Sequence, residues 1–220
     1  MSKVPYNTLN TSFATGDRPD FVRQNLNTIN DAIGADNLIF TNQIHGKGIL
    51  VLRRETFSNY PKPVDADAII TDIPRLGLMV KQADCQAVII FDSQKKVISN
   101  VHCGWRGNTL DILGSTVTRM TEEFGCKSSD LTAAIGPSLG PCCAEFVTYD
   151  RIFPGEFKRF MVRKNYFDLW ETSLRQLLHA GLKDENIEIA GICTRCRTNL
   201  FYSYRAEKIT GRFATVVMLK

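Results

Sequence analysis

Short apolar runs separated by turn-forming residues constrain the fold of this chain more than any other feature of its sequence. Runs of this length that are rich in β-branched residues are typical of β-strands. The runs are NLIFTNQI (37–44), GILVL (48–52), ADAIIT (66–71), LGLMVKQ (76–82), QAVIIF (86–91), KVISNV (96–101), LTAAIG (131–136), IEIAGICT (187–194), LFYSYRAE (200–207) and RFATVVML (212–219). Strands that follow one another in groups favour an α+β class, with mixed β-sheets and helices on the outside, over a regular doubly wound sheet.

Three segments have the apolar periodicity of amphipathic helices. They are expected over 18–34, 108–125 and 168–181, and each ends at a glycine, which is a common helix terminator. In the third segment, Asp168 and Glu171 resemble a capping box. The expected apolar faces consist of Val22, Leu26, Ile29, Ile33, Leu110, Leu113, Val117, Met120, Phe124, Trp170, Leu174, Leu177 and Leu178.

Length and charge narrow the class of protein. At 220 residues, the chain is expected to form a single domain over 1–220. Its net charge of +4 comes from Lys and Arg residues scattered among acidic ones, so no nucleic-acid partner is expected. No apolar run approaches the ~20 residues that cross a bilayer, and no apolar signal segment opens the chain, so we expect a cytoplasmic protein without a membrane partner. The sequence does not indicate the oligomeric state.

Seven cysteines are spread along the chain, and an odd number in a chain without a secretory signal argues against a disulfide framework. Two pairs stand out, the vicinal Cys142 and Cys143 and the C-x-x-C pair Cys193 and Cys196. A redox C-x-x-C normally opens a helix after a strand, whereas this one continues toward the strand expected at 200–207. A zinc site built from both pairs would require them to be adjacent, which the sequence does not show. We therefore interpret all four as structural thiols.

Two histidines and one cysteine adjoin the ends of expected strands: His45, Cys85 and His102. Strand ends and the loops beyond them present reactive side chains on a rigid frame. Two imidazoles and a thiolate can bind zinc and leave one coordination position open, as in catalytic zinc sites. However, a lone histidine at a strand end is more often structural, and the spacing matches no compact zinc motif. The residues alone leave both interpretations open.

A candidate anion site follows His102. Arg106 lies in a glycine-containing segment that leads into the helix expected at 108–125. Helix N-termini bind anions, and arginine binds phosphate through two N–H donors, so Arg106 is a candidate phosphate or oxyanion contact. A helix start beside an arginine is also common without any ligand, and this alternative stays open.

Three neighbouring residues are interpreted as structural. Asp84, beside Cys85, is expected to cap a turn rather than to act as an acid or base. Cys103 follows His102 on a strand, so its side chain should point to the opposite face and be buried and inert. His179 is expected at the surface or as a cap, in the last turn of the third helix.

Nine segments together carry a family resemblance: NQIHG, DADAIITD, KQADC, HCGWRG, IGPSLGPCCAEF, YFDLW, GICTRC, FYSYR and GRFA, in this order between residues 42 and 214. They resemble the YfiH/laccase-domain family, known also as the polyphenol oxidase-like or purine nucleoside phosphorylase family. The resemblance covers nearly the whole chain. It implies that His45, Cys85 and His102 form a zinc site, because they match the histidine of Q-x-H-G, the cysteine of A-D-C and the histidine of H-x-G-W-R-G.

The resemblance also implies an activity. Family members are implied to phosphorolyse adenosine, inosine, guanosine and methylthioadenosine, and to deaminate adenosine. Purine nucleosides and phosphate are then the expected partners, and Zn²⁺ is the expected cofactor, which could act as a Lewis acid on the nucleophile or on the base. Copper is the alternative metal, because the family has also been credited with polyphenol oxidation and His2Cys sites bind copper.

Other functions remain as alternatives. Three histidines are too few for the blue copper and trinuclear cluster of a multicopper oxidase, which argues against laccase chemistry. A metal-independent Cys–His hydrolase would use Cys85 as the nucleophile beside His102. A non-catalytic accessory protein of the cell wall or of division would hold zinc only for structure. The chain also departs from the family pattern, which usually has a longer N-terminus and an alanine at the position of Cys103.

Overall fold

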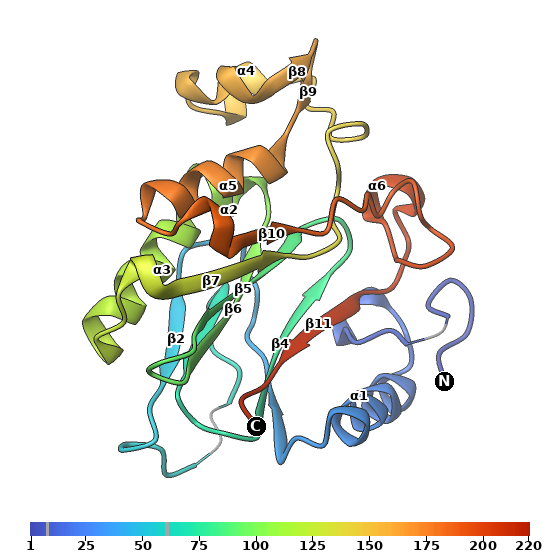
Figure 1. Ribbon diagram of the computed structural model, residues 1–220. Coiled ribbons are helices and arrows are strands. Elements are labelled where there is room, and N and C mark those ends of the chain that lie inside the picture. The colour runs from blue at the N-terminus through green and yellow to red at the C-terminus, as the bar shows by residue number, and fades with distance from the viewer. Residues whose placement is uncertain (8, 60–61) are drawn as a thin grey trace.

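The computed structural model describes residues 1–7, 9–59 and 62–220, and its centre is a six-stranded sheet (Figure 1). Across this sheet the strands are β10 (Ile187–Ile189), β7 (Leu131–Ile135), β5 (Gln86–Asp92), β6 (Val97–Cys103), β3 (Ala68–Thr71) and β2 (Ile49–Leu52). β5 pairs antiparallel with both β6 and β7, whereas β2 with β3 and β7 with β10 are parallel pairs. The mixed sheet predicted for an α+β protein is thereby confirmed.

A three-stranded sheet lies against the large one and joins distant parts of the chain. Its strands are, in order, β1 (Asn37–Ile39), β4 (Leu76–Gln82) and β11 (Phe213–Val217). An apolar cluster that includes Ile69, Leu78 and Ile98 has members in both sheets. Asn100 of β6 donates hydrogen bonds from Nδ2 to the carbonyl groups of Leu78 and Thr215, both at 2.9 Å. The two sheets are therefore joined by apolar and polar contacts.

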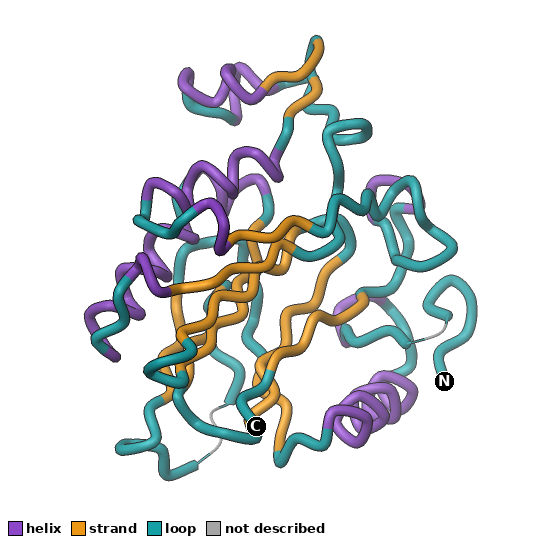
Figure 2. Tube along the Cα trace, viewed as in Figure 1, coloured by secondary structure: helices purple, strands orange, loops and turns teal. Residues whose placement is uncertain are grey.

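Helices lie on the outside of the sheets, as the purple segments of Figure 2 show. They are α1 (Pro19–Ile33), α2 (Trp105–Thr109), α3 (Ile112–Phe124), α4 (Tyr149–Ile152), α5 (Leu169–His179) and α6 (Tyr204–Glu207), with 3-10 turns at Phe13–Thr15, Ser128–Asp130, Gly155–Phe160 and Asp184–Asn186. α3 and α5 cover one face of the large sheet, where Leu113, Met120 and Leu177 are fully buried. Burial of each such side chain contributes roughly 1.5–3 kcal/mol.

An aromatic cluster extends the core beyond α5. It includes Phe146, Phe153 and Phe167, and it lies around a small hairpin. The hairpin consists of β8 (Met161–Arg163) and β9 (Tyr166–Phe167). Among the described residues, no helix combines the length and hydropathy that a membrane span requires.

The helix predicted over 108–125 is instead divided into α2 and α3. Between them, Asp111 adopts a left-handed conformation with a φ of 51°, and its side chain accepts a hydrogen bond from the N–H of Gly114 (3.2 Å). A side chain that caps a new helix start competes with continuation of the preceding helix. Leu110, which was expected on the apolar face, is consequently exposed.

The strand predicted over 200–207 is wrong, because this segment contains α6. Ser203 caps the helix, and its hydroxyl accepts a hydrogen bond from a backbone N–H three residues later (3.2 Å). Alternation of aromatic and polar residues imitates a strand here, but the serine cap starts a helix. The strands predicted over 37–44 and 187–194 are shorter than expected, since β1 and β10 end after three residues each. The remainder of both segments forms loops.

Candidate functional site

His45, Cys85 and His102 are brought together at the edge of the sheets. His45 lies in the loop between β1 and β2, Cys85 lies in the turn between β4 and β5, and His102 lies near the end of β6. One ligand atom from each residue is within 4.8 Å of the other two. Cys85 Sγ is 4.0 Å from His45 Nε2, and the two imidazole rings meet edge to face with their centroids 4.9 Å apart. Three residues that are distant in the sequence thus form one cluster.

A buried carboxylate, Asp67, holds this cluster in place. Its Oδ1 is 2.8 Å from Nδ1 of His102. It also accepts hydrogen bonds from the backbone N–H groups of His45 (3.0 Å) and Gly46 (2.8 Å), where the loop turns sharply at a residue with a φ of 61°. Asp67 therefore orients one imidazole directly and the other through its backbone. This leaves Nε2 of His102 facing Cys85.

Sequence reasoning missed Asp67, although the sequence contains a signal that could have identified it. The residue precedes the apolar run of β3, whose four residues are all buried. A carboxylate that enters a core with its neighbours must be paired, because an unpaired buried charge is strongly unfavourable. An aspartate in such a position therefore points to a histidine, an arginine or a group of N–H donors nearby.

The contacts within the cluster set its charges. Burial opposes a charge on Cys85, but the charge and hydrogen bond of His102, and then those of His45, lower the pKa of the Cys85 thiol to about 6. Burial also opposes protonation of His102, but the charge of Cys85 and the hydrogen bond with Asp67 raise the pKa of His102 to about 9. Burial raises the pKa of Asp67, but the hydrogen bonds that it accepts from His102 and Gly46 outweigh that effect and hold the pKa below its usual range. Cys85 is therefore a thiolate at neutral pH, which is the form that binds metals.

The cluster faces a cavity of about 1060 Å³. Segments from both ends of the chain contribute to its wall, including Thr15 near the N-terminus and Arg212 near the C-terminus. Aromatic side chains and cationic side chains also line it, namely Trp105, Phe146, Tyr204, Lys81, Arg106, Arg205 and Lys208. A cavity of this size is large enough for a small organic molecule and an anion together.

The backbone that follows His102 lies directly on the cluster. A Cβ atom at Gly104 would be 2.8 Å from Cys85 Sγ and 3.4 Å from His45 Cδ2, so only glycine fits there without displacing a candidate ligand. α2 begins one residue later, rather than at Asn108 as predicted. Arg106 is exposed, lines the cavity and places its guanidinium 4.4 Å from the centre of the Trp105 ring.

Two further cations of the cavity, Lys81 and Arg212, were not identified from the sequence. Burial lowers the pKa of both. Lys81 Nζ lies 4.6 Å from the centre of the Phe40 ring and 3.4 Å from the carbonyl oxygen of Thr41. The Arg212 side chain donates to the backbone carbonyls of residues 210 and 211. Within the part of the chain that the structure describes, neither forms an ion pair, so both are available to an anionic ligand.

The residues interpreted as structural have structural contacts. Asp84 has a φ of 90°, and its Oδ1 accepts hydrogen bonds from the hydroxyls of Thr194 and Ser203, both at 2.7 Å. Cys103 is buried in the apolar core, and burial raises the pKa of its thiol. His179 is exposed in the last turn of α5. Asp84 thus joins its turn to two C-terminal loops.

Comparisons with known proteins agree with this fold. The family described as Multi-copper polyphenol oxidoreductase laccase matches residues 1–220. A purine nucleoside phosphorylase of Corynebacterium glutamicum is 32% identical over 227 residues, which cover 100% of this chain and 90% of that protein. A purine nucleoside phosphorylase of Bacteroides thetaiotaomicron is 28% identical over 237 residues, which cover 99% of this chain and 87% of that protein. The crystal structure of the Bacillus licheniformis hypothetical protein YfiH matches with a TM-score of 0.90 at 29% identity, over 100% of this chain and 88% of that one.

Proposed function

This chain belongs to the family described as multi-copper polyphenol oxidoreductase laccase, whose model matches residues 1–220, and we propose that it is a zinc-dependent purine nucleoside phosphorylase. The observation that carries this proposal is the convergence of His45, Cys85 and His102 beside a cavity with aromatic and cationic walls. The relatives named purine nucleoside phosphorylase support the substrate class. The proposed partners are therefore a purine nucleoside and phosphate.

The donor set of the cluster fits zinc. Catalytic zinc sites use three protein ligands, commonly imidazole and thiolate groups, and keep the fourth position open. His45, Cys85 and His102 supply such a set within 4.8 Å. The thiolate character of Cys85 and the hydrogen bond that His102 donates from Nδ1 to Asp67 prepare two of these ligands for a metal. When bound, zinc would supply Lewis-acid polarisation of an oxygen or nitrogen atom of the reactants.

Polyphenol oxidation, which the descriptive name of the family suggests, is supported less well by this chain. Oxidation of that kind needs a blue copper and a trinuclear cluster, and hence many histidines. The chain has three histidines, and one of them, His179, is exposed on α5 and lies outside the cluster. A single copper ion could bind Cys85, His45 and His102, and an absorption band at about 600 nm after copper loading would reveal it.

The side chains of the cavity can position both reactants for phosphorolysis. In this reaction a phosphate oxygen bonds to C1′ of the ribose while the C1′–N9 bond breaks, and the purine leaves with the electron pair and takes up a proton. Lys81, Arg106 and Arg212 are suited to hold the phosphate, because two of them have no ion-pair partner and the third is exposed to the cavity. Tyr204, which is exposed on the wall of the cavity, is suited to stack against the purine. Fixing both reactants removes much of the entropic cost of their reaction.

We extend the proposal to deamination of adenosine in the same cavity. In this reaction water adds at C6 of the purine and ammonia leaves, which gives inosine. The two reactions share the nucleoside and differ in the nucleophile, which is phosphate in one and water in the other. Omission of phosphate should therefore stop the formation of adenine while the formation of inosine continues.

The direct test is incubation of the zinc-loaded protein with adenosine, with and without phosphate, followed by liquid chromatography–mass spectrometry. We expect adenine and ribose 1-phosphate when phosphate is present, and inosine in both cases. His102→Ala should reduce all products below detection, whereas His179→Ala, which changes an exposed histidine outside the cluster, should leave them unchanged. Absence of products from protein with zinc fully bound would contradict the proposal and favour a binding role.

One observation favours a second candidate, a metal-independent hydrolase. Cys85, His102 and Asp67 follow the order of nucleophile, base and orienting carboxylate, with the carboxylate 2.8 Å from the imidazole. Such an enzyme would be inactivated by alkylation of Cys85 and would keep its activity in the presence of a chelator. Loss of activity on chelation and recovery with zinc would exclude this candidate.

A further inference from the structure

Four cysteine side chains that form two separate pairs in the sequence meet in a second cluster. Cys142 and Cys143 lie in the loop between β7 and α4, and Cys193 and Cys196 lie in the segment between β10 and α6. The four sulfur atoms all lie within 4.8 Å of one another. The sulfur of Cys196 is 3.7 Å from that of Cys142 and 3.5 Å from that of Cys143. The two pairs are therefore adjacent, which is the condition for a shared metal site.

We propose that Cys142, Cys143, Cys193 and Cys196 bind a structural zinc ion. Tetrahedral zinc with Zn–S bonds of about 2.3 Å separates its sulfur ligands by about 3.8 Å. The separations of 3.5 Å and 3.7 Å at Cys196 are close to this value, so only small side-chain movements are needed to bind the ion. Four protein ligands complete the coordination shell and leave no position for a substrate. This ion therefore serves the structure and not the reaction.

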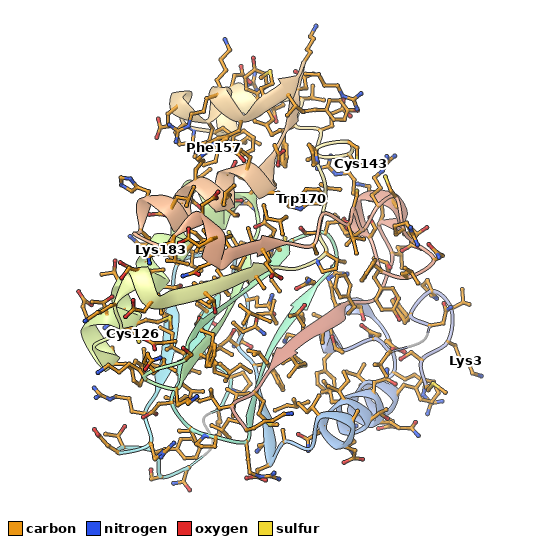
Figure 3. The ribbon with its side chains drawn as sticks, viewed as in Figure 1. Lys3, Cys126, Cys143, Phe157, Trp170 and Lys183 are labelled. Atoms are coloured by element: carbon orange, nitrogen blue, oxygen red, sulfur yellow. The ribbon has the colours of Figure 1, made fainter. Side chains whose placement is uncertain are left out.

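Backbone contacts that do not involve the thiols already hold the two cysteine-bearing loops side by side. Ser138 and Cys193 form a parallel β-bridge, and the N–H of Thr194 donates to the carbonyl of Ser138 (3.0 Å). A Cβ atom at Gly140 would lie 3.1 Å from Cys193 Cβ and 2.8 Å from the Trp170 ring, so glycine permits the close approach of the loops. Figure 3 labels Cys143 near Trp170, and it labels Cys126 far from both. The backbone thus places the four thiols together without help from a disulfide.

The surroundings of this cysteine cluster suit a negatively charged metal centre. Arg195 Nη1 lies 3.4 Å from Cys143 Sγ, and Arg163 Nη2 donates to the carbonyl of Cys142 (3.1 Å). Arg205 Nη1 donates to the carbonyl of Cys143 (3.5 Å). Four thiolates and one Zn²⁺ have a net charge of about −2, which nearby guanidinium groups offset.

Zinc at this position would brace the wall of the cavity. Asp84 accepts hydrogen bonds from the N–H of Leu139 (2.8 Å) and from the hydroxyl of Thr194 (2.7 Å). These two donors belong to the two loops that carry the four cysteines, and Asp84 directly precedes Cys85 in the chain. A crosslink between the loops would thus stabilise the turn that presents Cys85. The inference itself does not depend on the proposed activity.

The test counts zinc in protein purified under reducing and anaerobic conditions with zinc supplied. By inductively coupled plasma mass spectrometry we expect about two zinc ions per chain in the unsubstituted protein and about one in Cys193→Ser/Cys196→Ser. Cys126→Ser, which removes a buried cysteine outside both clusters, should keep about two. His102→Ala should lose the ion of the first cluster only, so a failure of the proposed function and a failure of this inference are distinguishable. An equal zinc content with and without Cys193 and Cys196 would overturn the proposal.

A second measurement does not require any variant to fold. X-ray absorption at the zinc edge of the unsubstituted protein should show a shell dominated by sulfur, because five of seven expected protein ligands are thiolates (four plus one). A shell of mainly nitrogen and oxygen would overturn the proposal. A mass lower by two hydrogens, with a Cys142–Cys196 or Cys143–Cys196 disulfide after proteolysis, would also overturn it and assign a redox crosslink instead.

Discussion

The two clusters of this protein have related donor atoms but opposite architectures. The cluster of His45, Cys85 and His102 has three candidate ligands, is oriented by a buried carboxylate and faces a cavity of about 1060 Å³. The cluster of Cys142, Cys143, Cys193 and Cys196 lies on two loops, and two of its members are exposed. Three ligands beside a cavity leave room for a reactant, whereas four ligands form only a crosslink. Under the two proposals, the number of donor residues and their support separate a centre for chemistry from a centre for stability.

The largest expected effect concerns folding stability at the four-cysteine cluster. At free zinc a thousandfold above its dissociation constant, one site stabilises the folded state by about 4 kcal/mol. Chelation should lower the free energy of unfolding of the unsubstituted protein by this amount beyond the loss seen in Cys193→Ser/Cys196→Ser. Urea denaturation with zinc and with chelator measures the difference. If chelation lowers the free energy of unfolding equally in the unsubstituted protein and in Cys193→Ser/Cys196→Ser, the four-cysteine cluster does not contribute to stability through zinc.

The next effect concerns the carboxylate that supports only the three-ligand cluster. Asp67→Asn should weaken zinc binding at that cluster by about 10- to 100-fold, because a carboxylate that is hydrogen-bonded to a ligating histidine fixes the orientation of the imidazole. Competition titration with a chromophoric chelator should show the change in one of two zinc ions. Asp65→Asn, at an exposed aspartate of the same DADA segment, is the matched control and should bind both ions normally. A loss at both clusters would mean that Asp67 acts on the whole fold.

A smaller effect concerns pH in the metal-free protein. The pKa of Cys85 is lowered to about 6, so its stabilisation is lost as the pH falls through that value. The pKa of His102 is raised to about 9, so its stabilisation is lost as the pH rises through that value. Each contribution is complete only beyond the unfolded-state pKa, which is about 8.5 for cysteine and about 6.5 for histidine, so the gain of one and the loss of the other nearly cancel between these values. The free energy of unfolding should therefore be nearly constant between about pH 6.5 and pH 8.5 and should fall by about 0.7 kcal/mol below pH 6 and above pH 9, as measured by chemical denaturation. His102→Ala should flatten this profile, and a flat profile in the unsubstituted protein would contradict the ion pair.

A comparably small effect concerns phosphate. Arg106→Ala should raise the KM for phosphate by about three- to tenfold and leave kcat nearly unchanged, because an exposed guanidinium adds about 1 kcal/mol of charge-assisted hydrogen bonding. Initial rates at varied phosphate measure the change. Arg119→Ala, at an exposed arginine of α3 that pairs with Glu123, is the control and should have a normal KM. A lower kcat with an unchanged KM would place Arg106 at the reacting centre instead.

Patterns of several residues predicted most of the fold, and single capping residues account for two of the errors. The strand at 76–82 and the helix ending at Gly34 were correct, because apolar periodicity and a glycine stop agree there. Asp111 divided one predicted helix, and Ser203 replaced a predicted strand with α6. A cap acts through one hydrogen bond of about 1 kcal/mol, which apolar periodicity does not reveal.

For the candidate site, the metal-binding chemistry of individual residues could be predicted before their spatial neighbours were known. The residue types at His45, Cys85 and His102 and the segments around them led to one metal cluster, and the structure brings the three together. Asp67 escaped notice because its partner His102 is 35 residues away in the sequence. Lys81 and Arg212 escaped notice because only the tertiary structure places them on the wall of the same cavity.

The sequence by itself determined most of the elements and apolar faces and the donor atoms available to a metal, because these depend on residue type and local spacing. Tertiary structure alone decided which donors meet. It brought Cys142 and Cys143 against Cys193 and Cys196, across about fifty residues of chain, through a β-bridge and a glycine contact between loops. Adjacency of this kind depends on the path of the backbone through the whole fold, which local patterns do not encode.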